Sequence, residues 1–211
     1  MRLVVFGATG PTGRQIVGQA TAAGHRVVAV ARRPEVIDVR HSLLKVARGD
    51  VMDPESVAAA VIDAEAVLSA LGAANLKQPT KLYSQGTATI VSAMAAAGVA
   101  RFVGVTAAPV APALEKSALD RYFAHPLLWR FFGGGYADMQ AMERVLAHSE
   151  CDWTIFRPPR LTNGPLTNRY RTAVGKPLPR CWSLRRADLA AVMLASLGDA
   201  SLISKAVAIA N

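Results

Sequence analysis

The stretch that decides the fold is Leu3-Val4-Val5-Phe6 followed by Gly7-Ala8-Thr9-Gly10-Pro11-Thr12-Gly13. The four apolar residues predict a short strand that is buried on both faces, as in a parallel sheet. The segment that begins at Gly13 has the length of a helix and is followed by Gly24, where a left-handed cap is expected. A strand, a glycine-rich turn and a helix therefore predict a βα unit at this end of the sequence.

The same alternation of short apolar runs and longer Ala-rich segments continues along the chain. Further strands are expected at 26–30, 44–47, 66–70, 102–105, 154–156 and 206–209, and helices at 13–23, 54–62, 84–97, 137–148 and 186–197. This order is typical of an α/β fold, and it predicts a Rossmann-like, doubly wound and mainly parallel sheet. Because no repeat or long linker divides the chain, residues 1–211 are expected to form a single domain.

Two segments interrupt the alternation, at 107–136 and at 158–182. Both follow expected strands, and ligands bind beyond the carboxyl ends of the strands in open α/β sheets. We therefore expect these segments to form the walls of a substrate pocket. The three consecutive glycines Gly133 to Gly135 are interpreted as a hinge for a lid over that pocket.

The composition excludes several classes of protein. Of 211 residues, 52% are hydrophobic and 18% charged, which is unlike a disordered chain. No run approaches the roughly 20 uncharged apolar residues of a membrane span, and a cytoplasmic protein without membrane attachment is expected. The two cysteines, Cys151 and Cys181, lack the spacing of a metal or redox motif, so no metal site is predicted.

The glycine turn has the pattern of a dinucleotide-binding site. In such a site the first glycine permits a tight turn, the second lets the backbone approach a pyrophosphate, and the third lets helix and strand pack closely. The helix N-terminus then offers free N–H groups and a partial positive charge. The residues expected to bind the cofactor at this turn are Gly7, Thr9, Gly10, Pro11, Thr12 and Gly13.

The end of the second strand indicates which dinucleotide is bound. A carboxylate there would bind the ribose hydroxyls of NAD, whereas arginine accommodates the extra phosphate of NADP. This chain has Arg32 and Arg33 and no acid before Glu35, so NADP(H) is expected in preference to NAD(H). The ends of the next two strands add Asp50, Val51, Leu71 and Gly72, although Asp50 has the alternative role of capping the following turn.

Four blocks together resemble the short-chain dehydrogenase/reductase superfamily, in its atypical NAD(P)H-binding branch of flavin and biliverdin reductase-like and nitrogen-metabolite-repression regulator-like proteins. The blocks are the glycine turn at 7–13, Arg48-Gly49-Asp50-Val51, the stretch 152–159 (DWTIFRPP) and Arg186-Ala187-Asp188-Leu189-Ala190. The resemblance spans nearly the whole chain. It implies NADP(H) in the crevice of a Rossmann-like sheet, with Pro158 beside the nicotinamide and the substrate between the loops that follow the last strands.

The chain departs from the broader superfamily at its catalytic Tyr-x-x-x-Lys pair. Tyr136 is followed four residues later by Gln140. Without the lysine that lowers the pKa of the tyrosine, Tyr136 is equally a proton donor or a pocket wall. Thr106 follows the fifth strand directly, at the position where the superfamily has a substrate-polarising hydroxyl. Three roles are open for its hydroxyl: a hydrogen bond to a substrate carbonyl, a hydrogen bond to the nicotinamide amide, or no function.

The substrate side is expected to hold a conjugated small molecule. The segment 122–132 gathers Tyr122, Phe123, Trp129, Phe131 and Phe132, and most of these rings are expected to pack on the domain while Trp129 and Phe132 reach the pocket. Arg160 is the candidate partner for an anionic acceptor, and its alternative is a surface position without a role in binding.

The chain carries a formal net charge of +9, and the stretch from Trp153 to Ala187 contains eight Arg or Lys residues and no acid. These charges are expected to steer an anionic cofactor or substrate, and the alternative is that part of them forms an ordinary solvated face. Nucleic acid is not the expected partner, because no nucleic-acid-binding motif is present.

Two functions follow from these patterns. The first is an NADPH-dependent oxidoreductase that transfers a hydride to a flavin, a quinone-like compound or another conjugated acceptor, with the cofactor supplying the chemistry. The second is a non-catalytic NADP(H)-binding redox sensor, which the missing lysine motivates. A monomer or a homodimer fits both.

Overall fold

The computed structural model describes residues 1–115, 122 and 125–211. Within these residues the strands are β1 (Arg2–Phe6), β2 (Arg26–Ala31), β3 (Leu44–Arg48), β4 (Ala66–Ser69), β5 (Arg101–Val105), β6 (Asp152–Arg157), β7 (Arg160–Thr162), β8 (Arg171–Val174), β9 (Ser183–Arg185) and β10 (Lys205–Ala210). The helices are α1 (Pro11–Ala22), α2 (Pro54–Val61), α3 (Leu82–Ala96), α4 (His125–Ala147) and α5 (Arg186–Ala195). Every strand and helix expected from the sequence is present.

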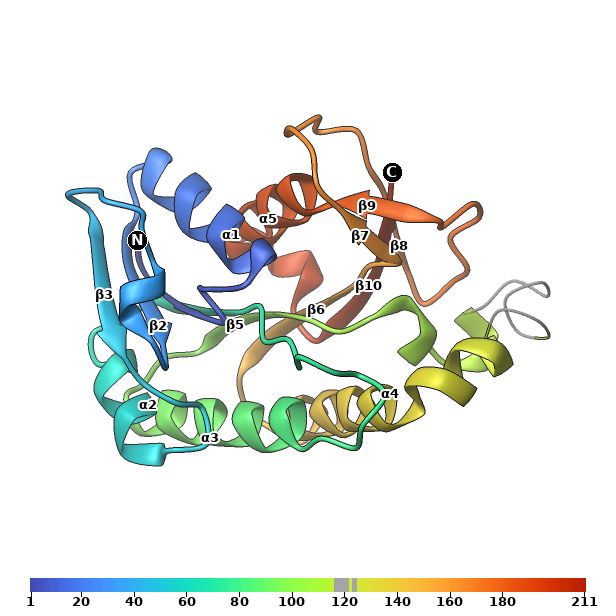
Figure 1. Ribbon diagram of the computed structural model, residues 1–211, viewed down its shortest axis with the longest axis horizontal. Coiled ribbons are helices and arrows are strands. Elements are labelled where there is room, and N and C mark those ends of the chain that lie inside the picture. Colours follow the sequence, from blue (N-terminus) through green and yellow to red (C-terminus); the bar gives the residue numbers. More distant parts are fainter. Residues whose placement is uncertain (116–121, 123–124) are drawn as a thin grey trace.

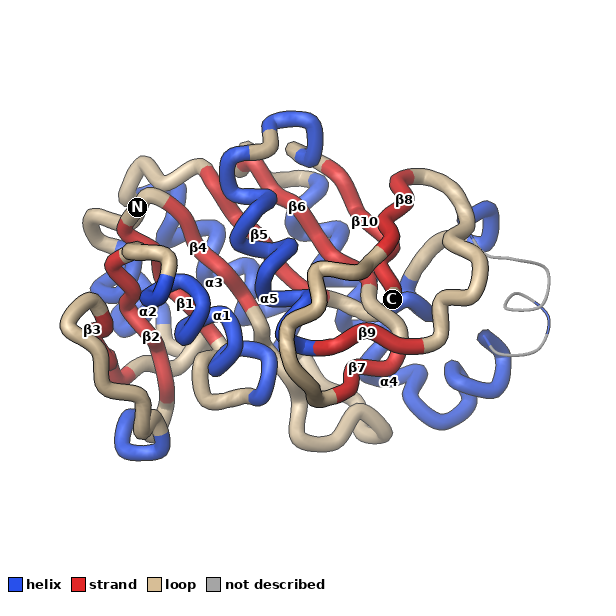
Figure 2. Tube along the Cα trace, turned by 90° about the horizontal axis from the view of Figure 1, so that it is seen from above, coloured by secondary structure: helices blue, strands red, loops and turns tan. Residues whose placement is uncertain are grey.

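The central sheet has eight strands in the order β3-β2-β1-β4-β5-β6-β10-β8 (Figure 2). Neighbouring strands are parallel except at one edge, where β8 runs antiparallel to β10. The expected doubly wound and mainly parallel sheet is therefore confirmed. The strand order reverses between β1 and β4, where Phe6 lies beside Ser69, and ligands of such sheets bind at the carboxyl ends of the strands near this point.

Helices cover both faces of the sheet (Figure 1). Helices α1 and α5 pack together on one face, and α2, α3 and α4 lie side by side on the other. Side chains alternate along a strand, so Leu3 and Val5 of β1 belong to the core beneath α1 and α5, while Val4 and Phe6 belong to the core beneath the other three helices. Burial on both faces explains the uninterrupted apolar run of this strand.

The largest difference from expectation is helix α4, which begins at His125 rather than at Ala137. Residues 125–136 of the expected wall 107–136 are therefore helical. Residues 116–121 and 123–124 of the same wall, with the predicted ring of Phe123, lie outside the described residues. The interpretation of Gly133 to Gly135 as a hinge was wrong, because all three lie within α4.

The glycines of α4 allow a loop to approach the helix closely. A Cβ at Gly135 would lie 2.7 Å from Leu76 Cδ2, and one at Gly134 would lie 3.1 Å from Pro79 Cα. The Gly135 amide donates a hydrogen bond to the carbonyl of Leu76 at 3.3 Å. These residues therefore hold the loop that follows β4 against α4.

The segment 158–182 is partly ordered into short strands. Strand β7 pairs in parallel with β9 in a separate two-stranded sheet, and β8 forms the edge of the main sheet. In the part of the chain that the structure describes, no helix has both the length and the apolar character needed to cross a membrane.

Candidate functional site

Two of the three glycines in the turn between β1 and α1 lie too close to neighbouring backbone to carry a side chain. Gly7 has φ +75°, and a Cβ there would collide with the carbonyl oxygen of Ala70 at the end of β4. A Cβ at Gly13 would collide with the carbonyl oxygen of Gly7. A Cβ at Gly10 would instead meet only the Gly7 oxygen, at 3.3 Å, so the protein itself nearly tolerates a side chain there. The space beside Gly10 is therefore open for a ligand.

Helix α1 presents unpaired amides at this turn. The Gly10 amide donates to the Gly7 carbonyl at 3.0 Å and the Arg14 amide to the Gly10 carbonyl at 2.9 Å, which closes the turn. Pro11 has no N–H, and the amides of Thr12 and Gly13 have no acceptor among the described residues. Free amides at a helix N-terminus bind phosphate groups. The turn therefore has the chemistry of a pyrophosphate site.

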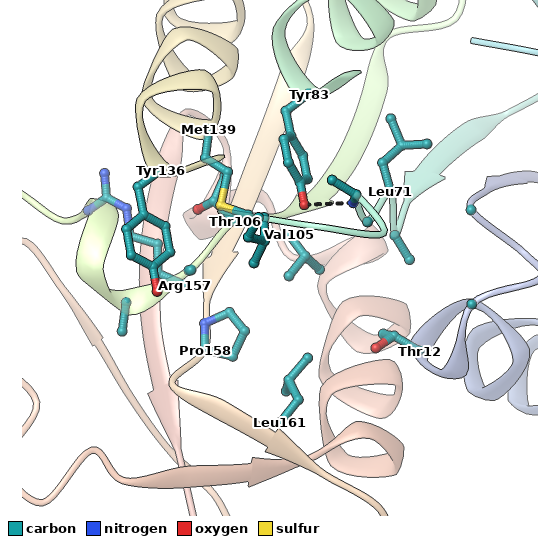
Figure 3. Close-up of a pocket in the computed structure, with 18 of the residues that line it drawn as sticks. Thr12, Leu71, Tyr83, Val105, Thr106, Tyr136, Met139, Arg157, Pro158 and Leu161 are labelled. Atoms are coloured by element: carbon teal, nitrogen blue, oxygen red, sulfur yellow. Dashed lines mark hydrogen bonds between the residues drawn. The ribbon is translucent and has the colours of Figure 1, made fainter. Parts of the chain in front are cut away.

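A cavity of about 780 Å³ runs from this turn along the carboxyl ends of the strands, and its size is typical of a ligand site. Figure 3 shows Thr12 on one side of it, and Tyr136 and Met139 projecting from α4 toward Thr106 and Pro158. The sequence-predicted residues that line the cavity are Gly7, Thr9, Gly10, Pro11, Thr12, Arg32, Asp50, Val51, Leu71, Gly72, Thr106, Tyr136, Pro158 and Arg160. Residues from both halves of the chain thus meet at one site.

Four predicted site residues lie outside the lining: Gly13, Arg33, Trp129 and Phe132. Gly13 packs beneath the turn, and Arg33 is exposed beside it. Trp129 Nε1 donates to the carbonyl of Pro109 at 3.1 Å, and the rings of Trp129 and Phe132 lie 5.8 and 6.1 Å from that of Tyr136. The two rings therefore support Tyr136 from behind, while the helical repeat of α4 turns Leu128, Tyr136 and Met139 to the cavity.

Asp50 has the capping role that the sequence left as an alternative. Its Oδ1 accepts from the Met52 amide at 3.0 Å, and its own amide donates to Ser56 Oγ at 3.1 Å. The turn after β3 is fixed by these bonds. A contact between Asp50 and the cofactor stays a prediction.

The floor of the cavity contains a buried cluster of charged residues around Arg157, the last residue of β6. Its Nε and Nη2 donate to Glu143 Oε1 and Oε2 at 3.0 and 2.6 Å, and its Nη1 donates to Glu115 Oε2 at 2.8 Å. The Arg157 side chain is 7% exposed, and those of Glu143 and Glu115 are 15% and 21% exposed. Burial alone would lower the pKa of Arg157, but the hydrogen bonds and charges of the two carboxylates raise it above its ordinary value. Arg157 therefore belongs to an internal ion cluster and is not one of the free cations expected to steer a ligand.

Thr106 is joined to the same cluster. Its hydroxyl donates to Glu143 Oε1 at 2.8 Å, and its amide donates to the carbonyl of Phe156 at 3.0 Å. A hydroxyl has one proton to donate and two lone pairs that accept. With its proton committed to Glu143, Thr106 offers an acceptor to the cavity. This arrangement favours an N–H donor on the ligand, such as a nicotinamide amide, over a substrate carbonyl.

Two tyrosines face the cavity. Burial raises the pKa of Tyr136, so its phenol stays protonated at neutral pH. Tyr83 Oη accepts from the Ala73 amide at 3.0 Å and so holds the loop after β4. Asp138 of α4 accepts from the Tyr83 and Ser84 amides at 2.8 and 3.3 Å, which caps the start of α3. Among the described residues, no lysine lines the cavity beside Tyr136.

Sequence reasoning missed Tyr83, Glu115, Met139, Arg157 and Trp182, all of which line the cavity. Arg157 lies inside the block that carries the family resemblance, and Trp182 lies at the end of the expected wall 158–182. Both positions were therefore visible in the sequence. Glu115 lies in the other expected wall, 107–136, but its ion pair carried no signal, because its partner Arg157 is 42 residues away along the chain.

Comparison with curated proteins finds relatives that are longer than this chain. An uncharacterized chloroplastic protein of Arabidopsis thaliana is 31% identical over 174 residues, which cover 79% of this chain and 61% of that protein. A 3-diazoavenalumate denitrifying reductase of Streptomyces is 36% identical over 179 residues, which cover 74% of this chain and 55% of the reductase. The chain thus spans little more than half the length of these relatives.

Solved structures share the whole fold. A short-chain dehydrogenase/reductase of Veillonella parvula in complex with NADP superimposes with a TM-score of 0.80 at 18% identity, covering 100% of this chain and 94% of that one. The anaerobilin reductase ChuY of Escherichia coli O157:H7 gives 0.78 at 23% identity, covering 100% and 97%. The NAD(P)H-binding family model matches residues 7–200. This match confirms the resemblance to the atypical short-chain dehydrogenase/reductases, and the chain belongs to the NAD(P)H-binding family.

Proposed function

We propose that the protein is an NADPH-dependent oxidoreductase that transfers a hydride to a flavin, a quinone-like compound or another conjugated acceptor. The observation that carries the proposal is one continuous cavity. It joins a glycine turn with free helix amides to a mainly apolar chamber at the ends of β5 and β6. A dinucleotide and a second small molecule both find suitable chemistry within it.

The residues present fit a nicotinamide dinucleotide. The amides of Thr12 and Gly13 and the open space beside Gly10 would hold the pyrophosphate. The nicotinamide half would then extend toward Thr106 and Pro158, where the Thr106 hydroxyl offers its acceptor. A bound nicotinamide supplies the hydride, and the chain orients it and excludes water.

The preference for NADP(H) rests on Arg32. This residue follows the buried end of β2, lines the cavity and is exposed, whereas the adjacent Arg33 is exposed but does not line the cavity. A guanidinium at this position matches the oxygens of a 2′-phosphate. Arg32→Ala is expected to raise the Kd for NADPH at least about tenfold and leave that for NADH nearly unchanged.

Arg33→Ala is the matched control for the cofactor experiment, because it removes an equal charge next to the site. Titration calorimetry of both variants with NADPH and NADH measures the four constants. Equal losses in the two variants would show a general charge effect and would refute a specific phosphate contact at Arg32. No binding of either cofactor to the unaltered protein would overturn the proposed function as a whole.

The acceptor chamber favours a flat and largely apolar molecule. Leu128, Met139, Leu161 and Trp182 supply apolar and aromatic walls, and the Tyr136 phenol and exposed Arg160 add a donor and a cation. Two proteins similar to this chain carry the name reductase, one of them an anaerobilin reductase. These features together support a conjugated acceptor with an anionic group.

A panel of acceptors tests the reaction. Purified protein with NADPH is incubated with FMN, riboflavin, a soluble quinone and biliverdin, and oxidation is followed at 340 nm. Turnover with at least one acceptor is the expected result. Tight NADPH binding with no oxidation by any acceptor would favour the second function, a non-catalytic redox sensor. The observation that favours the redox sensor is that no lysine lies beside Tyr136 among the described lining residues.

A further inference from the structure

The ion cluster at the cavity floor has unequal numbers of positive and negative groups. Glu115 and Glu143 both bind Arg157, and with both carboxylates ionised the described residues of the cluster hold one net negative charge. We propose that this partly buried charge makes the site bind the oxidised, positively charged nicotinamide more tightly than the reduced one and so makes bound NADPH a stronger hydride donor. The inference rests on the proposed function, because it requires a nicotinamide at this end of the cavity.

The excess charge is located on Glu115. Glu143 is bound by both Nε and Nη2 of Arg157 and by the Thr106 hydroxyl, so its carboxylate accepts three hydrogen bonds. Glu115 shares the same guanidinium through Nη1 alone, at 2.8 Å, and lines the cavity from the short turn Ala113–Glu115. One guanidinium thus serves two carboxylates, and the second is the one that faces the ligand space.

The other charged residues of the described cavity lining do not cancel this charge at the floor. Arg32 lies at the glycine-turn end, and Arg160 is exposed to solvent, which screens it. The Arg186 guanidinium is held by Asn163 Oδ1 at 2.8 Å in the loop beyond β7. Asp50 is bound into the turn after β3, and His125 lines the cavity from the first residue of α4. Arg157 is the one cation in hydrogen-bond contact with Glu115 among the described residues.

The consequence for the reaction follows from charge balance. When a hydride, meaning one proton with two electrons, passes from the nicotinamide to the acceptor, the ring changes from neutral to one positive charge. A nearby buried negative charge stabilises that product and costs the neutral ring little. The ratio of the Kd values for NADPH and NADP+ reports this effect directly, without any acceptor present. A tenfold change in the ratio corresponds to about 30 mV in the potential of a two-electron couple.

The test compares cofactor binding by the full chain and by Glu115→Gln, which keeps the shape and removes the charge. Calorimetry with NADP+ and with NADPH is expected to show a three- to tenfold rise in the Kd for NADP+, about the effect of one buried charge, and less than a twofold change for NADPH. Glu150→Gln is the matched control. Glu150 is an exposed carboxylate just before β6, at the opposite end of the strands from the cavity, and its loss should leave both constants unchanged.

Each outcome decides one question. An unchanged ratio in Glu115→Gln, with both cofactors still bound, overturns the inference and leaves the proposed function standing. Failure of the unaltered protein to bind either cofactor overturns the proposed function instead. If Glu115→Gln loses affinity for both forms equally, the carboxylate has a structural role only and the inference is again overturned. The conservative Glu115→Asp keeps the charge and should restore the preference for NADP+.

Discussion

Removal of the Arg157 guanidinium is the sharpest test of how the cavity floor is built. In Arg157→Met the three hydrogen bonds, at 3.0, 2.6 and 2.8 Å, are lost, and two carboxylates that are 15% and 21% exposed are left without their cation. Breaking a buried ion pair by removing one partner costs about 3–5 kcal/mol. For a chain of this size each kcal/mol lowers Tm by about 2–4 °C, so a decrease of about 6–20 °C is expected.

Urea unfolding of the ligand-free protein, followed by circular dichroism, measures the free energy directly. Arg160→Met is the matched control, because this exposed arginine lies three positions along the chain and its loss should cost less than about 0.5 kcal/mol. Arg157→Met combined with Glu143→Gln should recover at least about 1 kcal/mol, since it removes one stranded charge and keeps an acceptor for Thr106. The reasoning is refuted if Arg157→Met costs under 1 kcal/mol, or if the double variant is no more stable than the single one.

Two further predictions concern the glycine turn and the loop beyond β7. Gly10→Ala should leave Tm within a few degrees of the unaltered protein and lower cofactor affinity at least about tenfold. In Gly13→Ala the new Cβ meets the Gly7 carbonyl, so this variant should lose more than about 2 kcal/mol of stability. Thermal melts and cofactor titration of both variants separate these effects. Asp188 is fully buried and accepts bonds from Thr167 and Asn168; burial alone would raise its pKa, but these hydrogen bonds lower it. Since the folded pKa lies below the unfolded one, this stabilisation is complete above about pH 4 and is lost as the pH falls below that value. Asp188→Asn should therefore flatten the dependence of stability on pH below about pH 4 in acid titrations. A steep acid dependence that persists in the variant would assign the effect to other carboxylates.

The fold was largely predictable because its signals are local. A run such as Leu3–Phe6 is apolar on both faces because helices cover the strand on both sides. Gly24, with its positive φ, marks the end of the helix between the first two strands. Helix α4 was the exception. Gly133, Gly134 and Gly135 argue against a helix by propensity, yet contact with the loop at Leu76 favours small residues there. Tertiary packing overrode the local preference.

The cofactor half of the site was predictable for a similar reason. Its residues form a contiguous turn, and Gly7 and Gly13 are required by the backbone whether or not a ligand is bound. The substrate half was less accessible to sequence reasoning. Trp129 and Phe132 have the right chemistry, but the helical repeat of α4 places them behind Tyr136, while Trp182 reaches the cavity from another segment.

The sequence by itself determined the parallel sheet, the dinucleotide-binding turn and the position of Arg32 after β2, because each depends on residues close together in the chain. The tertiary structure alone decided what lies at the cavity floor. Glu115, Glu143 and Arg157 come from three separate elements, and no local pattern records that two carboxylates share one guanidinium. The sign of the charge next to a ligand is a sum over groups that folding brings together, so it becomes visible only when the chain is folded.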